Sequence, residues 1–464
     1  MKEFDRDIVS GSILRSVWKL AWPVVLLNLV NGVHAFVDHI LVGHFVASEN
    51  NAANAGIGVA WQVFLVIVVF IASLFHGMNV LVARYAGRQD RERLSQVFYD
   101  AFLTAILILV FIVAPIGYFL APYLLDFVNA ETDVQRHALP YIRLLFVCSA
   151  PLFLMFMLTG AFQASGEPKI PLKLGVLTTV LNVILSAILI PGLGPIPAFG
   201  ALGAGMGTVM APAVSVIIAL TLILRRRTII QPPPRFTLLP NLKVIRTVAR
   251  IGIPTGIQGV LLNLGGVFLL KFIGTLEHSS AAQAAYTICY AQLFSLITWP
   301  SFGMRAAAGT VMGQNIGAGD PARGKRAVAV AACIGASWAA VIGTAYWVFP
   351  GELLALFGAV DEPIVTYGKT FLHFLSFSGV FLATGLALTG GLQGAGETKI
   401  PMYIAFLSQI VILLGICQVF VLYGALTPTR VWAAVLVSHM SRLVITYTVF
   451  RTEKWAHTPV EFEQ

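Results

Sequence analysis

Asp38 is the residue whose surroundings most clearly suggest chemistry. It lies in NGVHAFVDHILVGHF (residues 31–45), the end of an apolar run that begins near Trp18. An ionised carboxylate in an apolar environment must pair, contact water or bind a proton. We therefore expect Asp38 to take up and release protons. The alternative is an interfacial carboxylate at the outer end of a helix that Gly43 terminates.

Two polar residues precede Asp38 at helical spacing. His34 lies four residues before it and Asn31 three residues further, so the three share one helical face that we expect to line a cavity. His34 either takes part in proton coupling or only hydrogen-bonds a neighbour. His39 and His44 lie on other faces, so these histidines do not converge on a metal site.

Further polar residues lie inside apolar runs and could line the same bundle. The expected ion-coupling set is completed by Asn182, Ser186 and Thr208, of which the first two share a helical face. The candidates for substrate contacts are Asn31, Gln62, Asn263, Tyr286, Tyr290, Gln292 and Arg305. Each alone could instead form a hydrogen bond between helices. For Arg305, a helix terminus, a lipid and an anionic substrate are all open as partners, while Lys271 is expected to extend to the outer membrane surface.

The composition requires membrane-spanning elements to position these groups. The chain has 464 residues, of which 58% are hydrophobic and 11% charged, and its mean hydropathy is +0.84. A soluble domain carries roughly 25% charged residues. About 20 apolar residues span a bilayer, and twelve such runs are predicted as helices: 16–43, 54–83, 94–120, 140–163, 169–190, 201–224, 245–274, 280–312, 325–349, 366–393, 399–423 and 431–450.

Loop charges predict the orientation of these helices. Alternate loops carry clusters of Lys and Arg, whereas the opposite loops hold few beyond Arg136 and Arg430. Because basic loops stay cytoplasmic, both termini are expected in the cytoplasm. The net charge of +9 thus reflects topology and does not indicate nucleic-acid binding. The first run lacks the cleavage site of a signal peptide, so we expect it to be retained. The four cysteines lack metal or CxxC spacing and are expected to be core residues.

The second half of the chain repeats the first. LTGAFQASGEPKIP (158–171) returns as LTGGLQGAGETKIP (388–401), with nine of fourteen residues identical at an offset of 230. An offset of 231 aligns Pro23 with Pro254, and Asp38 with Leu269. We predict two six-helix lobes, 1–228 and 244–464, related by an axis along the membrane normal and joined by a cytoplasmic linker, 229–243. This plan is typical of transporters that bind substrate between or within the halves.

Motifs for nucleotide hydrolysis and for common enzymes are absent. No phosphate loop, kinase signature, nucleophile elbow or HExxH is found. An ion gradient is therefore the expected energy source, and no cofactor is expected. An intramembrane enzyme is disfavoured because the deep carboxylate lacks a second catalytic partner.

The chain resembles the multidrug and toxic compound extrusion (MATE) family. The resemblance rests on Pro23 followed by VDHILVGHF, on VMGQNIGAGDPARGKRA, and on the paired GAFQASGEPKIP and GGLQGAGETKIP. With Asn182 and GALGAGMGTV, it covers nearly the whole chain. It implies two lobes with a central cleft, and export of organic, often cationic or amphipathic, compounds in exchange for H⁺ or Na⁺. One branch places the coupling carboxylate in the first helix, where Asp38 stands, and Asn182 and Thr208 match further polar positions of that branch.

The chain departs from the family pattern at two places. That branch commonly has an Asp where this chain has Ser186, and another branch has acids in the helices matching 245–274 and 366–393, which contain none here. Hard cations need several oxygen ligands, so proton coupling is favoured over Na⁺ coupling.

The sequence therefore predicts an all-α polytopic protein of the inner or plasma membrane that exports small organic compounds in exchange for protons. We expect it to be a monomer. The alternatives are a Na⁺-coupled exporter of the same family, a lipid-linked precursor flippase of the same superfamily, and a membrane receptor or scaffold.

Overall fold

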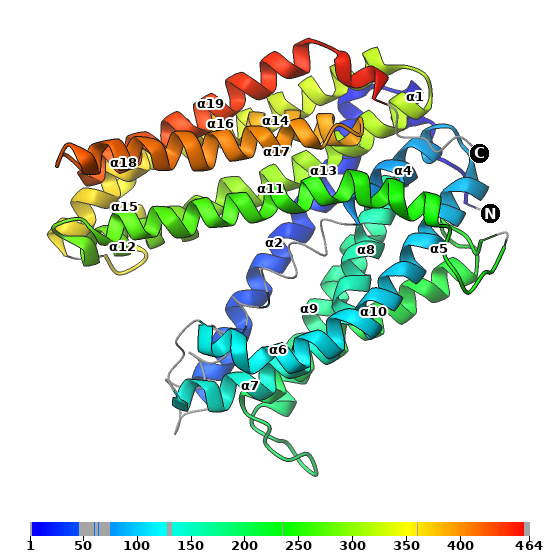
Figure 1. Ribbon diagram of the computed structural model, residues 1–464, viewed down its shortest axis with the longest axis horizontal. Coiled ribbons are helices and arrows are strands. Elements are labelled where there is room, and N and C mark those ends of the chain that lie inside the picture. The colour runs from blue at the N-terminus through cyan, green and yellow to red at the C-terminus, as the bar shows by residue number, and fades with distance from the viewer. Residues whose placement is uncertain are drawn as a thin grey trace. The chain divides into compact units, whose positions relative to one another are not determined.

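The computed structural model describes residues 2–45, 60, 64, 75–127, 132–233, 235–359 and 361–458, with the backbone alone for residues 31–45. All regular structure in this described part is helical (Figure 1). The first half contains α1 (Asp7–Ser10), α2 (Ile13–Phe45), α4 (His76–Gly87), α5 (Arg91–Ile108), η1 (Leu109–Val113), α6 (Ala114–Phe127), α7 (Thr132–Val147), α8 (Ala150–Ala164), α9 (Lys169–Leu189) and α10 (Ala201–Leu224). The second contains α11 (Leu242–Gly274), α12 (Ser279–Tyr286), η2 (Thr287–Leu293), α13 (Ser295–Gly317), α14 (Pro321–Val348), α15 (Pro350–Ala355), α16 (Glu362–Gly394), α17 (Lys399–Ala405), η3 (Phe406–Leu414), α18 (Gly415–Leu422), α19 (Pro428–Arg451) and η4 (Lys454–His457).

Ten of the twelve predicted spans have a counterpart of sufficient length and apolarity among these helices, if the bent pair α7 and α8 is counted as one span. Within the described residues, nine helical stretches are long and apolar enough to cross a membrane, and α7 with α8 forms a tenth if their 52° bend is one broken span. The bend precedes Pro151, whose missing N–H suits the first turn of α8. The predicted run 280–312 corresponds to α12, η2 and α13, and most of 54–83 lies outside the described residues. The predicted all-α polytopic membrane fold is confirmed.

The described residues form two compact units. The first comprises those of 2–4 and 26–252, and the second those of 5–25 and 253–458. Helices α2 and α11 therefore each contribute their first turns to one unit and their remaining turns to the other.

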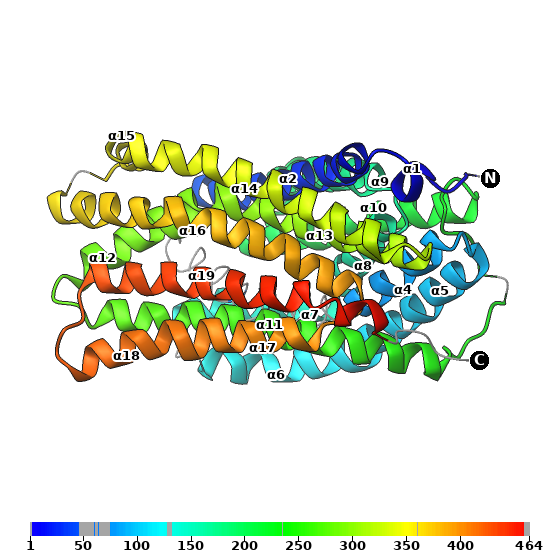
Figure 2. The ribbon, with the colours of Figure 1, turned by 90° about the horizontal axis from the view of Figure 1, so that it is seen from above.

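In the second unit, α13, α14 and α19 pack around α16 (Figure 2). Glycine allows the backbones to approach closely. A Cβ added to Gly343 of α14 would lie 2.7 Å from the carbonyl oxygen of Ser376, and one added to Gly390 of α16 would lie 2.1 Å from that of Arg305. The glycine-rich end of α16 is thus required for its packing against α13.

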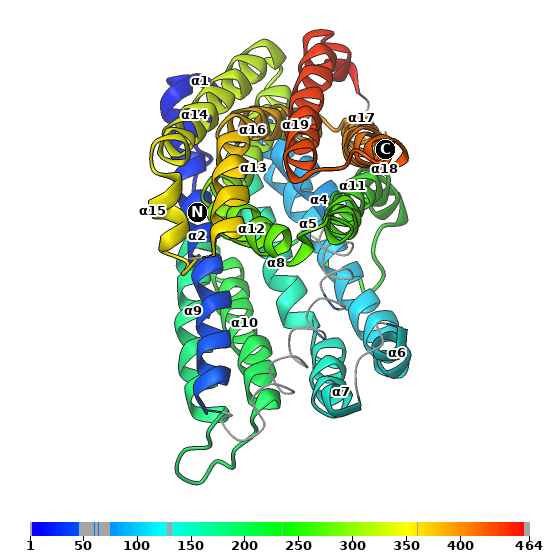
Figure 3. The same cartoon turned by 90° about the vertical axis from the view of Figure 1, so that its left-hand side faces the viewer.

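In the first unit, α9 and α10 lie side by side with the adjoining part of α2 (Figure 3). A Cβ added to Gly203 of α10 would lie 2.6 Å from the carbonyl oxygen of Leu189, and one added to Gly175 of α9 would meet the side chain of Leu27 at 2.2 Å. These contacts explain the run of small residues in GALGAGMGTV.

The sequence repeat is matched by repeated local structure. Gly166 and Gly396, 230 residues apart, both adopt positive φ angles of 94° and 90° after a helix. The amide of Glu167 donates to the carbonyl of Phe162, and that of Glu397 donates to that of Leu392 in the same way. Both copies therefore end a helix with the same glycine turn.

A second pair of turns shows the same correspondence. Gln89 and Gly319 have φ angles of 61° and 86°. The following residues, Asp90 and Asp320, accept hydrogen bonds from amides three residues later, at 3.1 and 2.8 Å. The two halves thus share helix starts as well as helix ends.

In the described part of the chain, three π-helical segments interrupt the spans, and the sequence did not predict them. They are η1, η2 and η3, which lie within the predicted runs 94–120, 280–312 and 399–423. Such segments shift the direction of the following side chains and are frequent at functional sites. Two of them, η2 and η3, help to form the cavity described next.

Candidate functional site

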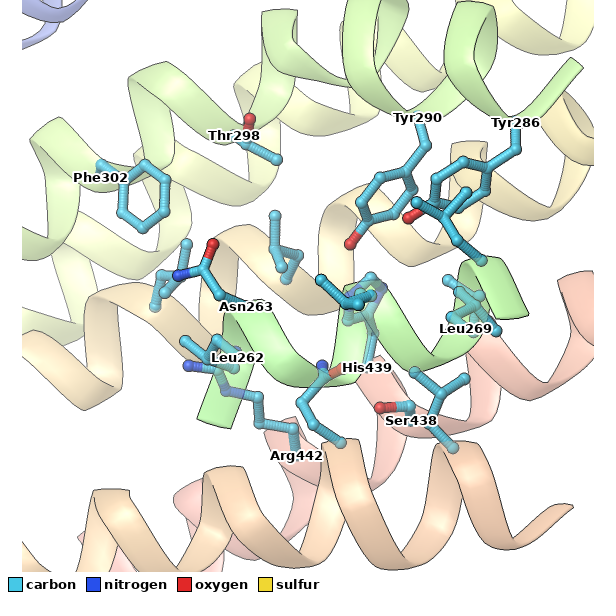
Figure 4. A pocket seen from close by; sticks show the side chains of 18 residues that line it. Leu262, Asn263, Leu269, Tyr286, Tyr290, Thr298, Phe302, Ser438, His439 and Arg442 are labelled. Carbon is cyan, nitrogen blue, oxygen red and sulfur yellow. The ribbon is translucent and has the colours of Figure 1, made fainter. Parts of the chain in front are cut away.

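The second unit contains a cavity of about 410 Å³. Its lining side chains come from α11, α12, η2, α13, α16, η3 and α19. Figure 4 shows Tyr286 and Tyr290 on one side, and Ser438 and Arg442 on the other. The volume lies within the range of pockets that bind small molecules, roughly 300–1,000 Å³.

One wall of the cavity is a stack of aromatic rings. Tyr286 and Tyr290 are parallel, with ring centres 5.1 Å apart and an interplanar angle of 12°. Tyr286 also stacks on Phe371 at 6.0 Å, and Phe371 on Trp432 at 3.9 Å. Because Phe371 and Trp432 are fully buried, they hold the tyrosines from behind. The stacked rings therefore turn their hydroxyl groups and ring edges toward the cavity (Figure 4).

The opposite wall, on α19, is polar and cationic. Ser438 donates a hydrogen bond to the carbonyl of Ser408 at 2.8 Å. His439 and Arg442 are 3% and 5% exposed, yet His439 Nδ1 and Arg442 Nη2 have no hydrogen-bond partner among the residues that the structure describes. None of the described residues lining the cavity is acidic. The cavity thus offers donor groups and positive charge without a carboxylate among its lining residues.

Arg305 of α13 is not among the described residues that line the cavity. Its Nε and Nη2 donate to Gln393 Oε1 at 3.0 and 2.8 Å. Gln393 Nε2 in turn donates to Gln258 Oε1 at 2.8 Å. These hydrogen bonds link α13, α16 and α11. The hydrogen-bond partner of the Arg305 guanidinium is therefore the neutral amide of Gln393.

The predicted coupling residues Asn182, Ser186 and Thr208 are buried at the α9–α10 interface of the first unit. A Cβ at Gly207 would lie 2.7 Å from Ser186 Oγ and 3.4 Å from Asn182 Nδ2, which places both side chains against α10. Thr208 Oγ1 donates to the carbonyl of Ala204 at 3.0 Å. The structure therefore brings these residues to one helix interface.

The remaining predicted positions separate into three groups. The side chains of Asn31, His34 and Asp38, and all of Gln62, lie outside the described residues. Asn263, Tyr286 and Tyr290 come together at the cavity, with the Asn263 amide also donating to the carbonyl of Gly259. Gln292 and Arg305 are not among the lining residues. In the described part of the chain, no cluster of three or more His, Cys, Asp or Glu side chains could hold a metal ion.

Several buried polar residues were not predicted as site residues, among them His439, Arg442 and Asp100. His439 and Arg442 are three residues apart within the predicted run 431–450, and that spacing on one helical face was the available signal. Asp100 of α5 is fully buried, and its Oδ1 accepts a hydrogen bond from Gln96 at 3.3 Å. The first unit therefore contains a buried carboxylate besides the predicted one.

The MatE family model matches residues 23–188 and 254–418. The chain belongs to this family. The two matched segments begin 231 residues apart, at Pro23 and Pro254, which is the offset of the internal repeat. The MatE protein is accordingly a multi-pass membrane transporter and not an enzyme, as predicted.

Relatives of this MatE protein cover nearly its whole length. It is 24% identical to the probable multidrug resistance protein NorM of Thermotoga maritima, over 96% of this chain and 93% of the relative. Among solved structures, an outward-facing multidrug resistance MATE family transporter of the MOP superfamily matches with a TM-score of 0.88 at 20% identity, covering 98% of both chains. A MOP superfamily transporter from Pyrococcus furiosus, whose binding pocket is described as having reverse polarity, matches with a TM-score of 0.87 at 20% identity and the same coverage.

Proposed function

We propose that the protein is a secondary active antiporter that exports small organic compounds, often cationic or amphipathic, in exchange for protons. The observation that carries the proposal is a cavity of about 410 Å³ with aromatic and polar walls in the second unit of a MatE transporter chain. The naming of full-length relatives as multidrug resistance proteins supports a broad substrate range.

Proton coupling is assigned to Asp38 on α2. In the outward-facing state the carboxylate takes up a proton, which removes the penalty of a charge in an apolar segment. The helices of the first lobe then rearrange and substrate is released. In the inward-facing state Asp38 releases the proton to the more alkaline side, and the deprotonated protein binds substrate again.

The residues near Asn182 support H⁺ over Na⁺. Ser186, buried against α10, supplies a neutral hydroxyl where a related branch commonly has a carboxylate. A Na⁺ site needs several oxygen ligands, preferably charged, whereas protonation requires one carboxylate.

Transport in proteoliposomes tests both parts of the proposal. Substrate efflux is measured under a pH gradient alone and then under a Na⁺ gradient alone, and we expect only the pH gradient to drive it. Asp38→Asn should abolish the response to the pH gradient. The matched control is Asp126→Asn, which removes an exposed carboxylate on α6 that accepts from Gln135. Efflux driven equally by Na⁺, or an Asp38→Asn variant with the parent's proton exchange, would contradict proton coupling through Asp38.

The lobe organisation and location are also proposed. We place lobes 1–228 and 244–464, linked by 229–243, in the inner or plasma membrane as a monomer with both termini cytoplasmic. Protease protection of terminal epitope tags in right-side-out vesicles tests the orientation. A lipid-linked precursor flippase or a scaffold would show no substrate-dependent proton flux.

A further inference from the structure

We propose that the cavity of the second unit binds organic anions, namely compounds that join a flat aromatic body to a carboxylate or sulfonate group. This inference narrows the proposed substrate range, for this cavity, to amphipathic compounds that are anionic and not cationic, and it rests on the proposed function for its assumption that the cavity serves transported compounds. It assigns the anionic group to Arg442 and the aromatic body to the wall formed by Tyr286 and Tyr290.

Arg442 provides the anchor for the negative charge. Only 5% of this residue is exposed, and its Nη2 has no hydrogen-bond acceptor among the described residues. A buried N–H group of a charged side chain that lacks an acceptor is unfavourable. A carboxylate or sulfonate would relieve this, because guanidinium groups bind such anions through short, charge-assisted hydrogen bonds.

A second cation reinforces the preference. Arg305 lies close enough to Arg442 to interact with it electrostatically, and its own hydrogen bonds are to the neutral Gln393. Two like charges in a low-dielectric region repel each other. An anion bound in the cavity beside Arg442 would offset this repulsion, whereas a cation bound there would be repelled by both arginines.

The other side of the cavity suits a flat ring. The Tyr286 and Tyr290 rings are parallel and are supported by Phe371 from behind. A ligand ring can pack its face against their edges, because edge-to-face contacts between aromatic rings are favourable. Phe302, Leu262 and Leu269 add apolar contacts around the cavity. A volume of about 410 Å³ accommodates a two-ring compound with a short acidic side chain.

Three fluorescent ligands of similar size test the charge preference. Dansylglycine is anionic, dansylamide is neutral and dansylcadaverine is cationic, and all three become brighter in apolar sites. Binding to the purified full-length protein in a neutral detergent is measured by titration. We expect dansylglycine to bind at least about tenfold more tightly than dansylcadaverine, since a hydrogen bond to a charged group contributes that much or more.

Variants test whether Arg442 causes the preference for anions. Arg442→Gln should weaken dansylglycine binding by at least about tenfold and leave dansylamide binding unchanged, whereas Arg442→Lys should retain most of the anion preference. Arg451→Gln, which removes an exposed guanidinium from the same helix, is the matched control. Thermal unfolding of each variant shows that it is folded. Tighter binding of dansylcadaverine than of dansylglycine by the parent, or an unchanged preference in folded Arg442→Gln, would overturn the proposal.

Lipid occupancy is tested separately. Dansylglycine titrations are repeated in phosphatidylcholine nanodiscs with and without phosphatidylglycerol. Binding that persists in both supports a free organic anion, and competitive loss with phosphatidylglycerol overturns it in favour of a lipid headgroup. Because these are equilibrium measurements, an anion preference without proton-driven efflux would leave this inference standing while the proposed antiport failed.

Discussion

Gly394 at the end of α16 lies directly against the backbone of Gly309 on α13. A Cβ at position 394 would lie 2.1 Å from the Gly309 carbonyl oxygen and 2.7 Å from its carbonyl carbon and Cα. Carbon–oxygen contacts in proteins are ordinarily about 3.3 Å or longer. Gly394→Ala therefore forces the two helices apart by about 1 Å, because backbone atoms cannot rotate away as a side chain can.

This displacement should destabilise the protein by about 1–3 kcal/mol, the usual range for overpacking in a close-packed interior. Gly415→Ala is the matched control. Gly415 also has a helical backbone, and a Cβ there would meet nothing within 4 Å. Since alanine is preferred over glycine in helices by up to about 1 kcal/mol, the control should be neutral or slightly stabilising.

The assay is thermal unfolding of the purified protein in detergent. The fraction of protein that stays monodisperse is measured at each temperature. Gly394→Ala should lower the midpoint clearly relative to both the parent and Gly415→Ala. Equal midpoints for the two variants would show that the α13–α16 interface is looser than the structure indicates. The reasoning from the 2.1 Å approach would then be refuted.

Three further substitutions have defined outcomes. Gln89→Gly should raise the unfolding midpoint and Gly319→Ala should lower it, because both sites have positive φ and a non-glycine residue there costs roughly 1 kcal/mol; midpoints that moved in the opposite direction would contradict this. Ser186→Asp should make efflux respond to a Na⁺ gradient by adding a charged oxygen ligand, and efflux assays without that response would remove this argument for proton coupling. Leu269→Asp should weaken dansylglycine binding about tenfold relative to Leu269→Asn, since its carboxylate would compete for Arg442 across the cavity; equal affinities would argue against an anion site.

Much of the fold could be predicted from hydropathy. The runs 169–190 and 201–224 agree with α9 and α10 to within a residue at each end, because lipid requires a fixed apolar length. The π-helical segments could not be predicted. Residues 287–293, TICYAQL, contain no proline or glycine, so nothing local marks the extra residue in the turn. Such turns arise from the packing of neighbouring helices, which single-sequence periodicity does not encode.

The site was predicted only in part. Tyr286 and Tyr290 were recognised because polar aromatic residues are uncommon in the middle of an apolar run. Arg442 and His439 were overlooked because the mean hydropathy of 431–450 conceals two polar residues. Whether a buried charge is paired depends on which helices surround it, and that information is tertiary. Arg305 illustrates the same limit, since its partner Gln393 is 88 residues away in the chain.

The repeated scaffold carries different chemistry in its two halves. Leu269, the counterpart of Asp38 at an offset of 231, lines the cavity, so the second unit has an apolar side chain where the first repeat has a carboxylate. The counterpart of Arg442 at the same offset is Ala211, on α10. If protons are bound in the first repeat and anions in the second, the two ligands do not compete for one charged group. Communication between them must then use elements common to both units, and α2 and α11 are helices that contribute residues to each.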